Sequence, residues 1–351
     1  MDAQGLLTQM VDLGVADVFL ITGKPVSYKK GSSIFSYDEN MLMPQDTQDL
    51  IAQIYQMAGR PFERFLESGD DDFSFAIKGV SRFRVNAYKQ RGSLAAVIRV
   101  VSFNMPDPQA LSIPSIVLDL AQLRRGLVLI TGPAGSGKTT ALATIIDCIN
   151  NTRNAHIITL ENPIEFLHRH AKSLVSQREV SIDTASYAVA LRAALRQSPD
   201  VILIGELRDA ESISIAMTAA ETGHLVLSTL HTLGATNTVD RLVDSFSPEQ
   251  QAQVRMQLSM VLQAVVSMQL IPSLKGGVIP AFEIMTCNTA IRNLIREGRT
   301  HQIPAVINSS LVDGMVSMDT SLLKLYKNDL ISRQEMLIHA FTPELLEKLA
   351  N

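Results

Sequence analysis

The sequence predicts an α/β protein with two domains, and two observations lead to this expectation. Beyond residue 115, apolar runs of strand length alternate with segments of helical period, which is typical of a largely parallel sheet covered by helices. Residues 104–114 contain prolines and no periodicity, as expected of a linker. We therefore expect a smaller α+β domain over residues 1–103 and a larger α/β domain over residues 115–351.

The composition narrows the class of protein. The 351 residues are 46% hydrophobic and 19% charged, an ordinary balance for a globular chain. A net charge of −4 with a pI of about 6.0 gives no basic field, so we expect no nucleic-acid partner. No apolar run reaches the roughly 18–20 residues that cross a bilayer, and no signal peptide opens the chain, so we expect a cytoplasmic protein without direct membrane insertion. Its two cysteines are too few for a four-thiolate zinc site.

The first domain is expected to mix helices and strands. A strand is predicted over residues 18–21, helices over residues 48–58 and from residue 62, and three strands after Gly69. The middle one of these three carries Arg84 on its polar face, and the strand that returns beside it carries Arg99. The pattern fits a functional pair of arginines and equally a solvated polar face, and it does not distinguish the two.

A glycine-rich segment follows the apolar run at residues 127–131 and precedes a helix-forming segment. It fits the pattern G-x-x-x-x-G-K-[ST], known as Walker A. Its glycines let backbone N–H groups point at phosphate oxygens, and the helix adds its positive end. Lys138 supplies a cation for the β- and γ-phosphates, and the Thr139 hydroxyl can bind Mg²⁺. The predicted nucleotide-binding residues are Gly132, Pro133, Ala134, Gly135, Ser136, Gly137, Lys138, Thr139 and Thr140.

Acidic residues follow two further predicted strands. The run at residues 201–204 leads to Glu206, a Walker B type acid that can bind Mg²⁺ or orient the attacking water. Glu161 and Glu165 follow the strand predicted at residues 156–160. Either could be the general base, because both leave a strand at the edge where ligands of open α/β sheets bind.

Two histidines, His224 and His231, bracket the strand predicted at residues 225–229. Either could contact a γ-phosphate, although histidines in such a pattern are more often structural. From about residue 248 the chain is predicted to be mostly helical. Within that part, an apolar stripe at helical spacing runs through the segment Ala290, Ile291, Arg292, Asn293, Leu294, Ile295, Arg296 and Glu297.

These motifs, in this order, resemble the Walker A, Asp box, Walker B and His box of secretion-type ATPases. Over nearly its whole length the chain is similar to the PilT-type retraction ATPases of type IV pili. One departure is Asn162, which stands where the Asp box usually has aspartate. The segments that carry the likeness are residues 81–87, 176–180, 218–224 and, most characteristic of retraction motors, 290–297.

The resemblance implies a hexameric ring in which each subunit has an N-terminal PAS-like domain and a C-terminal RecA-like domain, with ATP at their junction. It implies that Glu165 is the catalytic base and Glu206 the Walker B acid. It also implies that Arg84 and Arg99 reach the nucleotide from the N-terminal domain. Segment 290–297 would serve retraction rather than ATP binding.

The implied function is a motor ATPase for pilus retraction and twitching motility. It would act through an inner-membrane platform protein, alone or with a paralogous motor, at the inner face of the membrane. The alternatives are an accessory retraction motor or another type II/IV secretion-type traffic ATPase. A non-hydrolysing scaffold and a DNA motor are less consistent with the acids, the arginines and the acidic pI.

Overall fold

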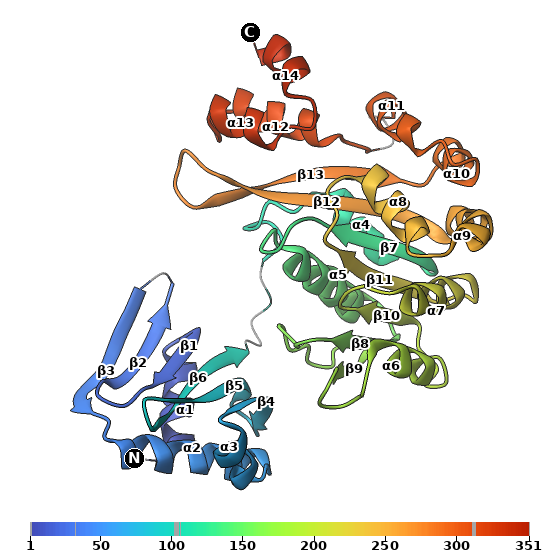
Figure 1. Ribbon diagram of the computed structural model, residues 1–351. Helices are drawn as coiled ribbons and strands as arrows, with labels where there is room; N and C mark the ends of the chain where they lie inside the picture. Colours follow the sequence, from blue (N-terminus) through green and yellow to red (C-terminus); the bar gives the residue numbers. More distant parts are fainter. Residues whose placement is uncertain (1, 32, 102–104, 106, 311–313, 351) are drawn as a thin grey trace. The chain divides into compact units, whose positions relative to one another are not determined.

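The computed structural model describes residues 2–31, 33–101, 105, 107–310 and 314–350 (Figure 1). The chain divides into two compact units, one with Met1–Asn104 and Ile164–Leu167, the other with Met105–Pro163 and His168–Asn351. Of the predicted linker, residues 104 and 106 lie outside the described residues, and residues 108–112 form turns. No helix among the described residues is long and apolar enough to cross a membrane.

The first unit is a six-stranded antiparallel sheet in the order β3-β2-β1-β6-β5-β4, with three helices (Figure 1). The predicted alternation in β5 is confirmed, because Phe83, Val85 and Ala87 are fully buried. They pack with the apolar side of α2, while the opposite face of the sheet carries the polar side chains. The elements are α1 (Ala3–Asp12), β1 (Asp17–Leu20), β2 (Pro25–Lys30), β3 (Ser33–Met41), α2 (Pro44–Ala58), α3 (Phe62–Ser68), β4 (Asp70–Ile77), β5 (Ser81–Gln90) and β6 (Ser93–Val101).

The second unit is a seven-stranded sheet in the order β13-β12-β7-β11-β10-β8-β9, parallel except for the β12–β13 pair. The expected largely parallel sheet is therefore confirmed. Its strands are β7 (Gly126–Thr131), β8 (His156–Glu161), β9 (Leu174–Glu179), β10 (Val201–Ile204), β11 (Leu225–Leu230), β12 (Leu262–Pro272) and β13 (Val278–Thr286). Its helices are α4 (Ser115–Asp119), α5 (Lys138–Thr152), α6 (Tyr187–Ala194), α7 (Ala210–Glu221), α8 (Ala235–Asp244), α9 (Pro248–Val261), α10 (Thr289–Arg296), α11 (Ile303–Ser309), α12 (Met318–Lys327), α13 (Arg333–His339) and α14 (Pro343–Ala350), with short 3₁₀ turns at Leu120–Gln122 and Thr300–Gln302.

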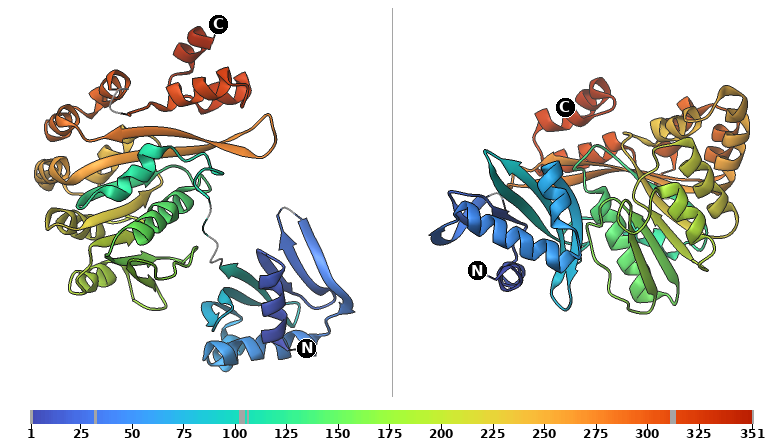
Figure 2. Two further views of the ribbon diagram at one scale, coloured as in Figure 1. Left: turned by 180° about the vertical axis from the view of Figure 1, so that it is seen from behind. Right: turned by 60° about the horizontal axis from the view of Figure 1, so that its bottom comes forward.

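Helices cover both faces of this sheet (Figure 2). Along β7, Leu127 and Leu129 pack with α6–α9, whereas Val128 and Ile130 pack with α4 and α5. Because successive side chains point to opposite faces, a strand covered on both sides becomes apolar throughout. The central strands of this unit have that character.

The expectation of a mostly helical end is wrong for residues 262–286, which form the β12–β13 hairpin. β12 lies beside β7 and is buried on both faces along most of its length. A mostly apolar strand that is buried on both faces does not show the period of two, so periodicity alone does not distinguish it from a buried helix. Helices resume at α10, as expected.

Candidate active site

The glycine-rich loop joins the end of β7 to the start of α5. Gly132 has a φ of 142°, and a Cβ added there would lie 2.3 Å from the backbone oxygen of Met268 on β12. Gly137, with a φ of 92°, precedes the first residue of α5 in a left-handed conformation. Both positions require glycine, because larger residues would collide with backbone or adopt a strained φ. The loop therefore lies tightly against β12 and opens onto the N-terminus of α5.

Lys138 lies along the inside of this loop. Its Nζ donates hydrogen bonds to the carbonyl oxygens of Gly132 and Pro133, both at 2.8 Å, and the residue is 7% exposed. Among the residues that the structure describes, the buried hydroxyl of Ser136 has no hydrogen-bond partner. A buried cation, a donor hydroxyl without a partner and a helix N-terminus together fit a phosphate group.

A cavity of about 340 Å³ adjoins the loop. Gly137, Thr140 and Ala141 line it from the start of α5, and Met268 lines it from β12. The remaining lining residues are mostly apolar: Ala110, Leu111, Ser112, Ile113, Leu270, Ser273, Lys275, Val278, Ile279, Pro280 and Leu330. A mostly apolar pocket of this size, next to a phosphate-binding loop, is suited to a flat ring such as a nucleobase.

The parallel register brings the predicted chemical groups to one edge of the sheet. Leu160, Ile204 and Ser228 pair in sequence across β8, β10 and β11, and Ser228 pairs with Leu129 of β7. Glu161, Glu206, His231 and the glycine-rich loop all follow these positions. They therefore leave the sheet at the same carboxyl edge, where ligands of such sheets bind.

Glu206 lies beside two basic side chains at this edge. It forms an ion pair with Arg208, its side chain is only 13% exposed, and its Oε2 lies 3.5 Å from Nε2 of His231. The Tyr187 phenol lies at the start of α6, near Glu206 and Glu161. Burial raises the pKa of this phenol, and the negative charges of Glu206 and Glu161 raise it further. Sequence reasoning missed Arg208 and Tyr187, although an arginine two residues after the Walker B acid was a visible signal.

The two candidate bases have different surroundings. Glu161 is 7% exposed, and its Oε1 accepts hydrogen bonds from the Thr159 hydroxyl at 2.6 Å and the Gln177 amide at 3.2 Å. Glu165, four residues later, is exposed to solvent. A buried carboxylate that accepts two hydrogen bonds is held in the fold, whereas an exposed one is accessible to substrate.

The two histidines separate to opposite edges of the sheet. His231 lies at the carboxyl edge beside Glu206, but His224 precedes β11 at its amino end, where its Nδ1 lies 2.9 Å from the carbonyl oxygen of Ala219. Six strand residues lie between them, or about 20 Å at 3.3 Å per residue. Of the two histidines predicted to be able to contact a γ-phosphate, only His231 therefore lies at the edge of the sheet where the loop is, and contact of either histidine with a phosphate stays a prediction.

Arg84 and Arg99 occupy the polar face of the first unit as directly opposed residues of β5 and β6. Each forms an ion pair: Arg84 with Asp72 at 2.7 Å and Arg99 with Asp17 at 2.8 Å. A depression of about 290 Å³ is lined by these four side chains together with Asn86 and Val97. The carboxylates offset the repulsion between two adjacent guanidinium groups.

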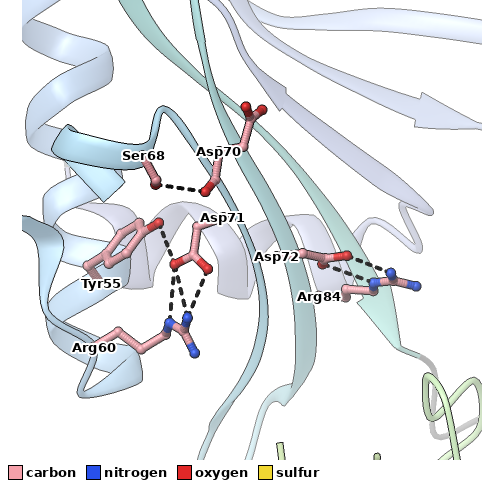
Figure 3. A network of polar contacts seen from close by, with 7 residues as sticks. All are labelled: Tyr55, Arg60, Ser68, Asp70, Asp71, Asp72 and Arg84. Atoms are coloured by element: carbon pink, nitrogen blue, oxygen red, sulfur yellow. Dashed lines mark hydrogen bonds and ion pairs between the residues drawn. The ribbon is translucent and has the colours of Figure 1, made fainter. Parts of the chain in front are cut away.

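Figure 3 shows that Asp71 and Asp72, two neighbouring acids of β4, point to opposite faces of this sheet. Asp71 accepts hydrogen bonds from the Tyr55 hydroxyl at 2.9 Å and from Arg60, on the side of the helices. The next residue, Asp72, points the other way and contacts Arg84. Burial and the charge of Asp71 raise the pKa of Tyr55.

Segment 290–297 lies in and just beyond α10. Ile291 and Ile295 are fully buried, so the predicted apolar stripe is confirmed. Arg292 donates to the carbonyl oxygens of Ser259 at 2.7 Å and Met260 at 3.0 Å, which belong to the last turn of α9. It therefore caps a neighbouring helix through carbonyls that have no partner within that helix. The exposed members of the segment are Ala290, Asn293, Arg296 and Glu297.

Similarity to known proteins agrees with this geometry. Residues 69–329 match the family model described as "Type II/IV secretion system protein". The type IV pilus retractation ATPase PilT of Pseudomonas aeruginosa is 43% identical over 348 residues, which cover 98% of this chain and 99% of that relative. The type IV pilus ATPase PilU of the same species is 37% identical over 341 residues, 97% of this chain and 89% of the relative. A crystal structure of the pilus retraction motor PilT with bound ADP has a TM-score of 0.89, with 44% identity and 99% of each chain covered.

Proposed function

Because the chain belongs to the type II/IV secretion system protein family, we propose that it is an ATPase motor that powers retraction of type IV pili. The observation that carries this proposal is the sheet edge of the second unit. A glycine-rich loop with a buried lysine, the acid Glu206 and His231 leave the sheet there together. The cavity beside the loop would take the nucleobase of ATP.

Each residue at this edge has a distinct role in the proposed reaction. The loop N–H groups and Lys138 would bind the phosphates and stabilise the charge that develops on them. Thr139 and Glu206 would hold Mg²⁺, since hydroxyl and carboxylate oxygens are its preferred ligands and phosphate oxygens would complete the set. When bound, that ion neutralises charge on the β- and γ-phosphates. Among the described residues, no three acidic, histidine or cysteine side chains form a metal cluster by themselves.

Glu165 is proposed as the general base that takes a proton from the attacking water. Its exposure supports this choice over Glu161, whose carboxylate is buried and accepts two hydrogen bonds. Arg84 and Arg99 are proposed to reach the nucleotide from a domain spanning residues 1–103, after exchanging Asp72 and Asp17 for phosphate oxygens. Hydrolysis would then wait until these arginines arrive, which couples turnover to movement of the domains.

The proposed working form is a homohexamer at the inner face of the cell membrane. There it would contact an inner-membrane platform protein, and segment 290–297 would serve retraction. A second candidate, an accessory motor beside a paralogue, is supported by the similarity to two different type IV pilus ATPases of one species. Twitching in a strain that lacks its own retraction ATPase would separate the two: a principal motor restores movement alone, and an accessory motor does not.

The decisive experiment compares ATP hydrolysis by the parental protein and Glu165→Gln, with light scattering on the same samples. We expect a hexamer whose activity is lost in Glu165→Gln while ADP still binds. Glu161→Gln is the matched variant at the other candidate position. Parental activity in Glu165→Gln would reject this residue as the base. A hexamer that binds ATP without hydrolysing it, with or without membranes, would favour a scaffold.

A further inference from the structure

Gln177, in the middle of β9, uses both ends of its side-chain amide. Its Nε2 donates to Oε1 of Glu161 at 3.2 Å, and its Oε1 accepts a hydrogen bond from the backbone N–H of His168 at 2.8 Å. Gln177 pairs in register with Thr159 of β8, whose hydroxyl donates to the same Glu161 oxygen at 2.6 Å. Residues 159, 161, 168 and 177 all belong to the second unit.

The two partners of this amide flank a short segment of chain. Glu161 is the last residue of β8, and His168 follows the segment of residues 162–167. One side chain therefore fastens both the beginning and the end of the segment that contains Glu165. Burial lowers the pKa of His168 to about 4, so its ring is neutral at pH 7 and adds no charge at this end.

We propose that Gln177 is a positioning residue for the catalytic base, which holds the segment bearing Glu165 by bridging Glu161 and the N–H of His168. This inference rests on the proposed function, in which Glu165 is the base. Gln177 acts through the segment and does not itself touch the reacting atoms. The position requires an amide, because the group must donate at one end and accept at the other.

The loss of rate expected when Gln177 is replaced follows from the position that a general base must have. A base must lie within hydrogen-bond reach of the proton that it removes, and a displacement of about 1 Å can cost about 10²-fold in rate. The phosphate-binding loop belongs to another connection of the sheet, between β7 and α5. Loss of Gln177 should therefore lower kcat and leave nucleotide affinity nearly unchanged.

The test uses Gln177→Leu, with Ser176→Ala as the matched control. Exposed Ser176 is the residue before Gln177 in β9, and its hydroxyl lies 3.0 Å from Nε2 of His156, away from Glu161. We expect kcat to fall about 10- to 100-fold in Gln177→Leu, with the Kd for ADP within about twofold of the parental value, and no change in Ser176→Ala. A parental kcat in Gln177→Leu would overturn the proposal.

A double-mutant cycle separates positioning of Glu165 from general support of the fold. Single-turnover hydrolysis is measured for Glu165→Gln with and without Gln177→Leu. If Gln177 acts through Glu165, the second substitution has no further effect when the base is absent. An equal fold-loss in both backgrounds would overturn the proposal. If the Glu165→Gln single variant hydrolyses ATP at the parental rate, Glu165 is not the base, and the inference about Gln177 is rejected with that assignment. If hydrolysis requires Glu165 but is unaffected by Gln177→Leu, only the inference about Gln177 is rejected.

If Gln177→Leu does not fold, Gln177→Glu tests the same bridging role. The substitution retains an acceptor for the His168 N–H but loses the donor toward Glu161 and places two carboxylates together. As the pH falls, the introduced carboxyl takes up a proton and can donate again. We expect its deficit relative to the parental enzyme to shrink as the pH is lowered. A deficit that is constant with pH would contradict the bridging role.

Discussion

The cations proposed to contact phosphate have different kinds of partners in the two units of this chain. Lys138 is buried within a loop of its own backbone and donates to two carbonyl oxygens. Arg84 and Arg99 lie on the open face of a sheet, where each pairs with a carboxylate and Arg99 is 66% exposed. The first arrangement is preorganised for an anion, and the second must exchange one anion for another.

This difference between the loop and the arginine pair indicates which residues can control the rate of hydrolysis. In the proposed function, Lys138 exchanges only neutral carbonyl acceptors for the phosphate, so it contributes to nucleotide affinity without displacing a competing carboxylate. Arginines that already pair with carboxylates can contribute to hydrolysis only when a phosphate oxygen replaces the aspartate as their partner. In the proposed motor, the second unit would thus bind the nucleotide, and turnover would in addition require the two arginines of the first unit.

The largest expected effect comes from removing the exposed cations. We expect Arg84→Ala, and likewise Arg99→Ala, to lower kcat about 10³- to 10⁵-fold, or about 4–7 kcal/mol, since arginines that reach a transferring phosphoryl group contribute this much in other NTPases. The Kd for ADP should change little, because the loop remains intact. ATPase assays and calorimetry measure both quantities.

Lys78→Ala provides the control for this experiment. Lys78 is an exposed cation of the same unit, in the turn between β4 and β5. It should leave kcat unchanged. If Arg84→Ala and Arg99→Ala also hydrolysed ATP at the parental rate, the face that holds them would be an ordinary solvated surface, and the contrast with the loop would disappear.

A smaller effect is expected from filling the space that makes the loop tight. At Gly132 an added Cβ would lie 2.3 Å from the Met268 backbone oxygen, so Gly132→Ala should shift the backbone and cost about 1–3 kcal/mol of stability, with weaker nucleotide binding. Gly135→Ala is the matched variant, because its φ is also positive, at 76°, but among the described residues no atom beyond its chain neighbours lies within 4 Å of the added carbon. Urea unfolding should show the larger loss for Gly132→Ala. Equal losses would mean that φ alone matters.

Local patterns predicted the parts of the site that lie close together in sequence. The glycine-rich loop is fixed by six residues between a strand and a helix, and the faces of β5 follow from simple alternation. The shared edge of Glu161 and Glu206 followed from the rule that ligands of open α/β sheets bind at the carboxyl ends of the strands. These features require no knowledge of distant partners.

The features that sequence reasoning missed depend on register and on distant contacts. His224 and His231 looked equivalent beside one strand, but parallel pairing places only His231 at the edge of the loop. The partners of Arg84 and Arg99 depend on which residues oppose each other in β4, β5, β6 and β1. The capping role of Arg292 depends on a helix about thirty residues earlier in the chain.

The smallest expected effect tests whether the aspartate partners are structural. Asp72 and Arg84 have side-chain exposures of 47% and 37%, so solvent screens their ion pair and we expect Asp72→Asn to lower stability by less than about 1 kcal/mol. Asp71→Asn, one residue earlier, should cost more, because Asp71 accepts a hydrogen bond from the buried Tyr55 as well as from Arg60. Urea unfolding of both variants measures the contrast. A loss in Asp72→Asn as large as that in Asp71→Asn would mean that the pair supports the fold, and that releasing Arg84 to a phosphate would carry a cost in stability that the proposed exchange does not include.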